Sequence, residues 1–265
     1  METLTQSIDR TAETGLSKAI KSRNVFGYLM GGALAGAFVG LGVTFMFTGP
    51  AAHYVAGSEW TQLLMGGVFG IGLIFIVFGG GELTTSGMMI MPIAAIKQRV
   101  SWLQATLTLL AMMVGNFIGS VTIALLTTYA NVYKDGSDPG IMLDGVLAGK
   151  IDKSNTEIFF RAIMCNILVC LAIWTTTRMK NEIAISLVLA WAITAFVAGG
   201  FEHVVANMTT FSLGLLNDAG GTTVFEMGRN LLFAFLGNLT GGGLFIGGSF
   251  LLATQMEKEP ANTGA

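Results

Sequence analysis

Long runs without a charged residue, separated by short polar connections, fill most of this chain. These runs cover residues 24–58, 60–81, 83–96, 100–133, 162–177, 183–201, 204–217 and 230–256. A helix needs about 20 mostly apolar residues to cross the roughly 30 Å hydrocarbon core of a bilayer. Four segments therefore each predict one membrane-spanning helix: 26–47, 103–129, 158–177 and 231–253.

Two further stretches, 61–96 and 183–216, are each too long for one helix and contain no polar connecting loop. Each is interrupted by glycines followed by a glutamate, at 79–82 in the first and at 199–203 in the second. We therefore predict an all-α polytopic membrane protein with six transmembrane helices, two of them interrupted. The predicted single transmembrane domain covers residues 25–255.

The two interruptions belong to an internal repeat. GGGELTTSGMM at 79–89 corresponds to AGGFEHVVANM at 198–208, and the pattern GNxxG follows each break, at 115–119 and 237–241. Three spans per half is an odd number, so the halves, about 25–133 and 155–255, must enter the membrane in opposite orientations. Matched breaks of this kind point to a transport site near the midplane, where half-helix amino-termini suit an anion. The alternative is a pair of packing kinks.

The ends of the chain predict how the protein sits in the membrane. Before the first span, over residues 1–24, apolar side chains recur at spacings of three and four: Leu4, Ile8, Ala12, Leu16, Ala19 and Ile20. This pattern predicts an amphipathic helix on the membrane surface, either a simple anchor or a gate. Lysine and arginine are enriched in the amino-terminal segment, the second and fourth connections and the tail at 256–265. Positive charge favours the cytoplasmic side, so we predict both termini in the cytoplasm of a cell whose inner membrane holds the protein.

Composition excludes several classes of protein. Only 11% of residues are charged, against about 25% in soluble domains. With 14 Lys+Arg against 16 Asp+Glu, no basic surface for nucleic acid is expected. The chain has two histidines and two cysteines, and Cys165 and Cys170 on one helix cannot form a disulfide. We predict no metal site and no cofactor.

A few ionisable residues stand inside the predicted membrane region, where each costs about 2.5 to 3.5 kcal/mol. Glu82 and Glu202 follow the two breaks, and we expect their carboxylates to accept hydrogen bonds from the loosened backbone; the alternative is direct contact with the substrate. His203 stands beside Glu202 and can exchange a proton near neutral pH, which favours a place in a pathway. Arg161 opens the fourth span, either reaching the interface or making an entrance electropositive. Four amides are suited to bridging helices or to bracing the breaks: Asn116, Asn166, Asn207 and Asn238.

Several segments together resemble the formate/nitrite transporter family. They are CNILVCLA at 165–172, FVAGGFEHVVANM at 196–208, GEL at 81–83 and LGN at 236–238, and the resemblance runs from about 26 to 253. It implies a homopentamer of six-span protomers, with an aquaporin-like inverted repeat and one pore in each protomer. It also implies a cargo of formate, nitrite, hydrosulfide or a related small monocarboxylate.

The resemblance also implies roles for single residues. His203 matches the family's central histidine, and the segment from Glu82 through Leu83, Thr84 and Thr85 matches its gating loop. The apolar constrictions match Phe69, Leu73 and Phe196, and the pore-region asparagines match Asn166, Asn207 and Asn238. This chain departs from the family at Thr84, where an aromatic residue is common, so we expect a wider or more polar gate. It also has Arg161 where a lysine is usual, and arginine keeps its proton, so only an electrostatic role is expected there.

The function expected from these residues is transport of a small monovalent anion of the formate or nitrite class, channel-like or proton-coupled through His203. A hydrosulfide or lactate/acetate channel of the same family stays open, as does a membrane scaffold that transports nothing. An enzyme built on Glu202 and His203 is not expected, because no HExxH, nucleophile elbow or cofactor motif accompanies them. Intramembrane acids and a histidine argue against a pore for water or glycerol.

Overall fold

The computed structural model describes residues 3–256, and every regular element within that range is a helix. The predicted tail at 256–265 begins at the last described residue and otherwise lies outside the described part of the chain. In the segment before the first span, α1 (Leu4–Lys21) begins at Thr3, whose hydroxyl accepts a hydrogen bond from the Gln6 amide. This capping satisfies one of the free amides of the first turn.

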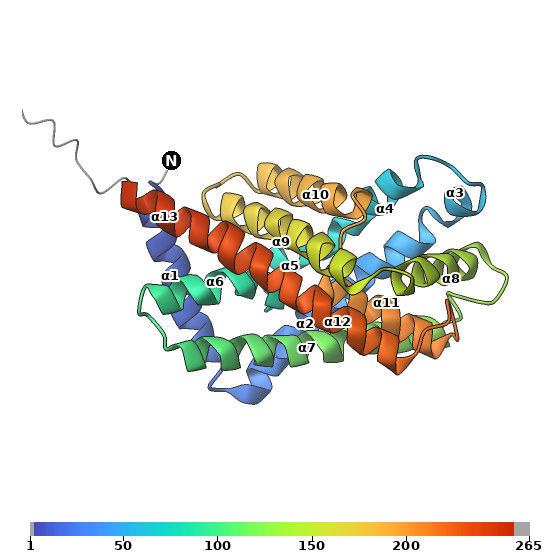
Figure 1. Ribbon diagram of the computed structural model, residues 1–265, viewed down its shortest axis with the longest axis horizontal. Coiled ribbons are helices and arrows are strands. Elements are labelled where there is room, and N and C mark those ends of the chain that lie inside the picture. The colour runs from blue at the N-terminus through green and yellow to red at the C-terminus, as the bar shows by residue number, and fades with distance from the viewer. Residues whose placement is uncertain (1–2, 257–265) are drawn as a thin grey trace, which may run out of the picture.

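The remaining helices follow in chain order. They are α2 (Val25–Thr48), α3 (Ala51–Val55), α4 (Thr61–Phe69), α5 (Ile71–Gly79), α6 (Thr84–Ile96), α7 (Trp102–Tyr129), α8 (Asp138–Ile151), α9 (Asn155–Thr177), α10 (Glu182–Ala198), α11 (Val204–Leu216), α12 (Val224–Leu239), the π-helix η1 (Thr240–Gly248) and α13 (Ser249–Met256). The long helices run side by side along the molecule (Figure 1). Helices α1 and α13 lie at one end, on the left of the view, and α3 and α8 lie at the other.

Both predicted interruptions are present. Helix α5 ends at Gly79 and α6 begins at Thr84, while α10 ends at Ala198 and α11 begins at Val204. Within the described residues, five segments are long and apolar enough to cross a membrane, and the shorter apolar helices are 84–96, 182–198 and 204–216. Each break also contains a glycine in the left-handed region, Gly80 with φ of 82° and Gly200 with φ of 65°. A residue with a Cβ rarely adopts this conformation, so glycine allows the chain to turn there.

Glycines also bring the long helices together. A Cβ on Gly36 of α2 would stand 2.0 Å from the Asn116 carbonyl oxygen, and one on Gly119 of α7 would stand 1.9 Å from the Ala33 carbonyl oxygen. Helices α9 and α12 meet in the same manner at Gly237, where a Cβ would lie 2.3 Å from the Phe159 carbonyl oxygen. Corresponding pairs of helices in the two halves are therefore packed backbone to backbone.

Four features of the fold are absent from the sequence prediction. Gly70 separates α4 from α5 within the stretch expected to continue to the break at 79–82. Helix α8 fills the third connection, where Ser137 caps its start and Met142, Leu143 and Leu147 are buried. The short helix α3 lies in the first connection. The last span is divided between α12, the π-helix η1 and α13, and it begins at Val224, seven positions before the predicted start at 231. A search for long apolar runs does not detect short surface helices such as α3 and α8. It also misses the amphipathic first turns of α12.

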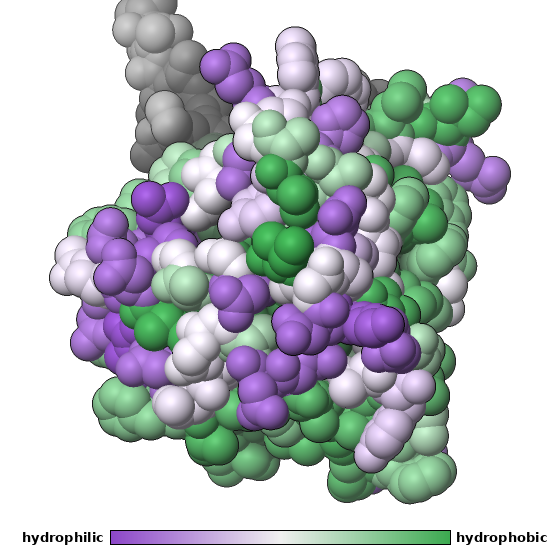
Figure 2. All heavy atoms as spheres, turned by 90° about the vertical axis from the view of Figure 1, so that its right-hand side faces the viewer, coloured by the Kyte–Doolittle hydropathy of each residue, from purple (hydrophilic) through white to green (hydrophobic). Residues whose placement is uncertain are grey.

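The surface divides into polar and apolar regions. Figure 2 shows the end of the molecule that carries α3 and α8, where hydrophilic residues gather across the face and hydrophobic residues gather along its lower and right-hand rim. Large apolar side chains are exposed on the long and the shorter apolar helices, among them Phe26, Leu107, Leu126, Ile183 and Trp191. A polar end and apolar flanks are what a protein embedded in a bilayer requires.

Candidate functional site

One asparagine holds the backbone of the first break. Asn116, fully buried on α7, accepts hydrogen bonds at Oδ1 from the Thr84 amide at 2.9 Å and the Thr84 hydroxyl at 2.8 Å. Its Nδ2 donates to the carbonyl oxygens of Glu82 at 2.9 Å and Gly32 at 2.8 Å. Unpaired backbone groups in a membrane cost several kcal/mol each, so this amide makes the interruption tolerable.

A second asparagine holds the second break in the same manner. Asn238, also fully buried, accepts at Oδ1 from the Val204 amide at 2.9 Å. Its Nδ2 donates to the carbonyl oxygens of Glu202 at 2.9 Å and Ala162 at 2.7 Å. The repeated GNxxG pattern of the sequence therefore has a structural meaning, because its asparagine is the brace of the corresponding break.

The expectation that the two glutamates brace the broken backbone is wrong, because the asparagines do so. The Glu82 carboxylate instead pairs with Lys18 of α1 and has the Lys21 Nζ at 3.9 Å. The Glu202 carboxylate lies 2.7 Å from the Lys150 Nζ and 3.5 Å from the Lys153 Nζ. A buried carboxylate needs an opposite charge to offset its lost hydration, and surface helices α1 and α8 supply the lysines.

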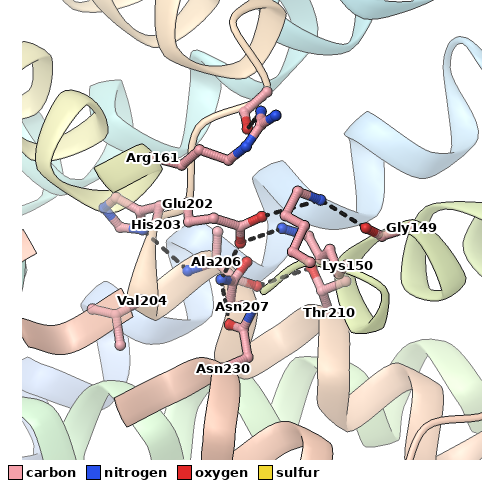
Figure 3. A network of polar contacts seen from close by, with 12 residues as sticks. Gly149, Lys150, Arg161, Glu202, His203, Val204, Ala206, Asn207, Thr210 and Asn230 are labelled. Atoms are coloured by element: carbon pink, nitrogen blue, oxygen red, sulfur yellow. Dashed lines mark hydrogen bonds and ion pairs between the residues drawn. The ribbon is translucent and has the colours of Figure 1, made fainter. Parts of the chain in front are cut away.

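The second of these clusters is the more deeply buried (Figure 3). The side chain of Glu202 is 1% exposed, against 13% for Glu82. Glu202 also accepts a hydrogen bond from the Asn207 Nδ2 at 2.7 Å, and the same nitrogen lies 2.7 Å from the Asn230 Oδ1. Burial lowers the pKa of the Lys153 ammonium, and the nearby Glu202 carboxylate partly opposes this effect. Two lysines face one carboxylate in each cluster, so each has an excess of positive charge when both lysines are protonated.

His203 lies between the two halves. Its Nδ1 accepts a hydrogen bond from the Ala206 amide at 3.1 Å, and its Nε2 lies 3.0 Å from the Thr85 hydroxyl. Because an amide can only donate, the neutral imidazole carries its proton on Nε2 and donates it to Thr85. The ring stacks on Phe196, with centroids 5.6 Å apart and planes 17° apart. Phe196 meets Phe69 edge to face, with centroids 5.8 Å apart.

Cavities lie on both sides of this ring. A cavity of about 280 Å³ opens toward α8 and is lined in part by Lys150, Lys153, Glu202, Asn207 and His203. A space of only about 10 Å³ lies beyond it, and its apolar wall includes Phe69, Leu73, Leu83 and Phe196. Phe69, Phe196 and His203 line both. A third cavity, about 300 Å³, lies beside the first break, with Lys21, Tyr28 and Glu82 in its wall. The central space holds about one water molecule, so the constriction is closed to a hydrated ion in this structure.

The structure separates some of the predicted site residues from these cavities. The Thr84 hydroxyl is directed at Asn116, so the wider or more polar gate expected from this residue does not follow. Arg161 donates from Nη1 to the Gly200 carbonyl oxygen at 2.9 Å, and it is absent from the described lining of the cavity beside Glu202. Asn166 lies behind the constriction, where its Nδ2 donates to the carbonyl oxygens of Thr85 at 3.1 Å and Asn238 at 2.7 Å.

Comparison with known proteins agrees with this architecture. A family model described as "Formate/nitrite transporter" matches residues 5–252. The chain belongs to the formate/nitrite transporter family. The nitrite transporter NirC of Salmonella typhimurium is 34% identical over 259 residues, which cover 97% of this chain and 94% of the relative. The formate channel FocA of Haemophilus influenzae is 30% identical over 263 residues, covering 91% of each chain.

Solved structures of the formate/nitrite transporter family share the fold. One, described as an FNT family ion channel, superposes with a TM-score of 0.85 at 33% identity and covers 94% of this chain and 99% of its own. Another, described as a pentameric formate channel with formate bound, gives a TM-score of 0.72 at 25% identity and covers 88% of this chain and 99% of its own. The all-helical, interrupted architecture is therefore that of the family.

The four lysines are the site residues that sequence reasoning missed in this member of the formate/nitrite transporter family. A signal for them exists, since the pattern Lys-x-x-Lys-Ser occurs twice, at 18–22 and at 150–154. Both copies end in a serine close to the start of a spanning helix. The repeat therefore extends beyond the spans to the helices α1 and α8, whose lysines face the two glutamates.

Proposed function

We propose that each protomer moves a small monovalent anion of the formate or nitrite class through a passage along these cavities. The observation that carries the proposal is the pairing of two lysine–glutamate clusters, one beside each break, with a narrow apolar constriction at His203 between them. The names of the related nitrite transporter and formate channel support the same class of cargo.

The mechanism follows from charge and hydration. The lysines attract the anion into a wet cavity, and their glutamate partners limit how tightly it is held. The apolar constriction excludes a bare charge, because transfer of an ion from water into such surroundings is very costly. Desolvation raises the pKa of a carboxylic acid, which is about 4 in water, so the anion takes up a proton as it leaves the cavity.

The neutral acid then passes the His203 ring. In this structure the imidazole is a donor at Nε2 and the Thr85 hydroxyl is its partner, so the passing acid can replace either one and hydrogen-bond to the other. The proton leaves the acid in the cavity on the far side, where water again favours the anion. Anion and proton move together in this scheme when protons are abundant at low pH, and the flow is more channel-like otherwise.

The same proposal includes the assembly and its place in the cell. The likeness to a pentameric channel supports a homopentamer with one passage per protomer. The start of α1 and the end of α13 lie at the same end of the molecule (Figure 1), and lysine and arginine gather in the connections of that end. We therefore place both termini in the cytoplasm and the protein in the inner membrane. The chain transports its substrate and does not convert it.

Proteoliposomes test the function directly. We expect uptake of formate and nitrite that exceeds uptake of lactate and hydrosulfide and that rises as external pH falls. His203→Phe should abolish the pH-dependent uptake, because the imidazole that hydrogen-bonds to the passing acid is lost and only the Thr85 hydroxyl remains. Equal uptake of glycerol and formate would favour a neutral-solute pore. No uptake of any of the four anions by correctly assembled protein would favour a scaffold.

A further inference from the structure

Thr85, in the loop that matches the family's gate, makes contacts through both its side chain and its backbone. Its hydroxyl faces His203, while its carbonyl oxygen accepts a hydrogen bond from the Asn166 Nδ2 at 3.1 Å. The Cys170 thiol, on the same helix α9, donates to the same carbonyl oxygen at 3.5 Å. Asn166 and Cys170 are four positions apart on α9, so they lie on one face of the helix, and both are fully buried.

The π-helix η1 makes room for this arrangement. It begins immediately after Leu239, and the nearby Asn238 carbonyl oxygen accepts a hydrogen bond from the Asn166 Nδ2. A Cβ on Gly242 would lie 2.6 Å from the Asn166 Nδ2 and 2.9 Å from the Cys170 Sγ. A Cβ on Gly241 would lie 2.4 Å from the Ile163 carbonyl oxygen. Long π-helices are rare and often occur at functional sites. Here the glycine backbone of the π-helix packs directly against Asn166 and Cys170, the two side chains that hydrogen-bond to the Thr85 carbonyl.

We propose that Cys170 is a positioning residue for the passage, and that Gly242 in the π-helix keeps it in place. Cys170 and Asn166 fix the Thr85 carbonyl, which sets the first turn of α6 and keeps the Thr85 hydroxyl within reach of His203. Neither Cys170 nor Gly242 is among the residues that line the described cavities beside His203. The inference rests on the proposed function, since it assigns these residues to the geometry of the same constriction.

The chain contains a matched control for Cys170. Cys165 is equally buried and is also on α9, but none of the described hydrogen bonds joins it to Thr85. Loss of either thiol removes the same volume from the core, so general packing predicts equal effects. A positioning role predicts that only Cys170→Ala disturbs the Thr85–His203 contact.

The first experiment reads that contact without measuring transport. The chain has only two histidines, so a His53→Gln background leaves His203 as the single source of imidazole nitrogen signals in ¹⁵N NMR of labelled protein in nanodiscs. The Thr85→Val variant gives the reference chemical shift of a His203 Nε2 that has lost its hydrogen bond to Thr85. We expect Cys170→Ala to move the His203 Nε2 signal toward that position and Cys165→Ala to leave it in place. Cys170→Ser should restore the signal, because a hydroxyl donates to the same carbonyl.

The second experiment measures formate uptake by the same variants. A thiol is a weak donor, so loss of its hydrogen bond predicts that Cys170→Ala lowers the rate about two- to fivefold, with recovery in Cys170→Ser. Gly242→Ala should lower it by more than about tenfold, because its new methyl group displaces both Asn166 and Cys170. Gly228→Ala, on α12 with open space around it, should transport like the parent.

The outcomes separate this inference from the proposed function. If the parent protein moves none of the anions, the proposed function fails, but the NMR comparison still decides the positioning role. An unchanged His203 signal in Cys170→Ala would overturn the inference. So would equal changes in Cys165→Ala and Cys170→Ala, or a Cys170→Ser variant that behaves like Cys170→Ala.

Discussion

At the scale of single residues, the half-helices α6 and α11 differ in the side chain at their amino-terminal ends. Leu83 precedes α6 and His203 precedes α11, and each is followed by a residue whose amide is held by an asparagine. The leucine side chain makes no capping bond, whereas the His203 imidazole caps its own helix. A symmetric backbone therefore presents one apolar wall and one hydrogen-bonding wall to whatever passes between them.

The two bracing asparagines should be essential for stability. Asn238→Ala leaves the Val204 amide and the carbonyl oxygens of Glu202 and Ala162 without these partners, at about 1 to 3 kcal/mol for each group left unpaired. We expect a melting temperature in detergent that falls by several degrees or a protein that fails to assemble. Asn116→Ala should have the same effect. Asn155→Ala should change little, because Asn155 is exposed and its one described side-chain hydrogen bond, from Arg229, is exposed as well. A normal melt for Asn238→Ala would contradict the bracing role.

The lysine beside Glu202 should govern how anions enter from the α8 side. Lys150→Gln removes the closest cation of the cluster, a loss of about 1 kcal/mol of attraction, or about fivefold in rate. Uptake driven from that side should fall accordingly in low salt and fall less in high salt, because ions screen the remaining charge. Lys134→Gln is the control, because it changes the net charge by the same amount on an exposed side chain away from Glu202. We expect it to change uptake less than Lys150→Gln does. Equal effects of the two substitutions would show that only the overall charge matters.

At the scale of elements, close backbone contact decides which helices pair. Gly36→Ala puts a methyl group 2.0 Å from the Asn116 carbonyl oxygen, so α2 and α7 must separate. We expect little folded protein by size-exclusion chromatography. Gly67→Ala, with open space around it, should be neutral or stabilise the helix by up to about 1 kcal/mol. Normal folding of Gly36→Ala would mean that the contact between these helices is less tight than described.

The sequence predicts the elements best where a single physical rule governs them. Apolar length locates most of the spans, and glycine followed by glutamate marks both breaks. A helix can end there because Asn116 and Asn238 pair backbone groups that would otherwise be unpaired in lipid. Helix α8 was not predicted because three buried apolar residues are too few for a span. The π-helix depends on which carbonyl pairs with which amide, and a run of glycines permits either pattern.

The candidate site was predictable in part for the same reason. His203 and the asparagines stand inside apolar segments, where any polar residue needs an explanation. Lys18 and Lys150 stand outside them, in segments that water reaches, and their relation to the breaks arises from how α1 and α8 fold back onto the bundle. Sequence reasoning used these lysines only for orientation, and the two glutamates were assigned the wrong partners as a result.

At the scale of the whole molecule, a polar end and apolar flanks require lipid or further copies of the chain around the protomer. We expect native mass spectrometry from detergent to give a mass about five times the 27.9 kDa of one chain. A monomer that still transports formate would leave the passage within the protomer intact and would contradict only the pentamer.

The agreement between α1 and α8 has a consequence for the two ends of the molecule. The surface helix ahead of the first spanning segment carries the same pair of lysines and the same following serine as its counterpart α8. The two-fold pattern of the chain therefore includes a charged mouth beside each break, one supplied by each surface helix. Removing the chain up to residue 22 would leave one mouth with its lysines and the other without them.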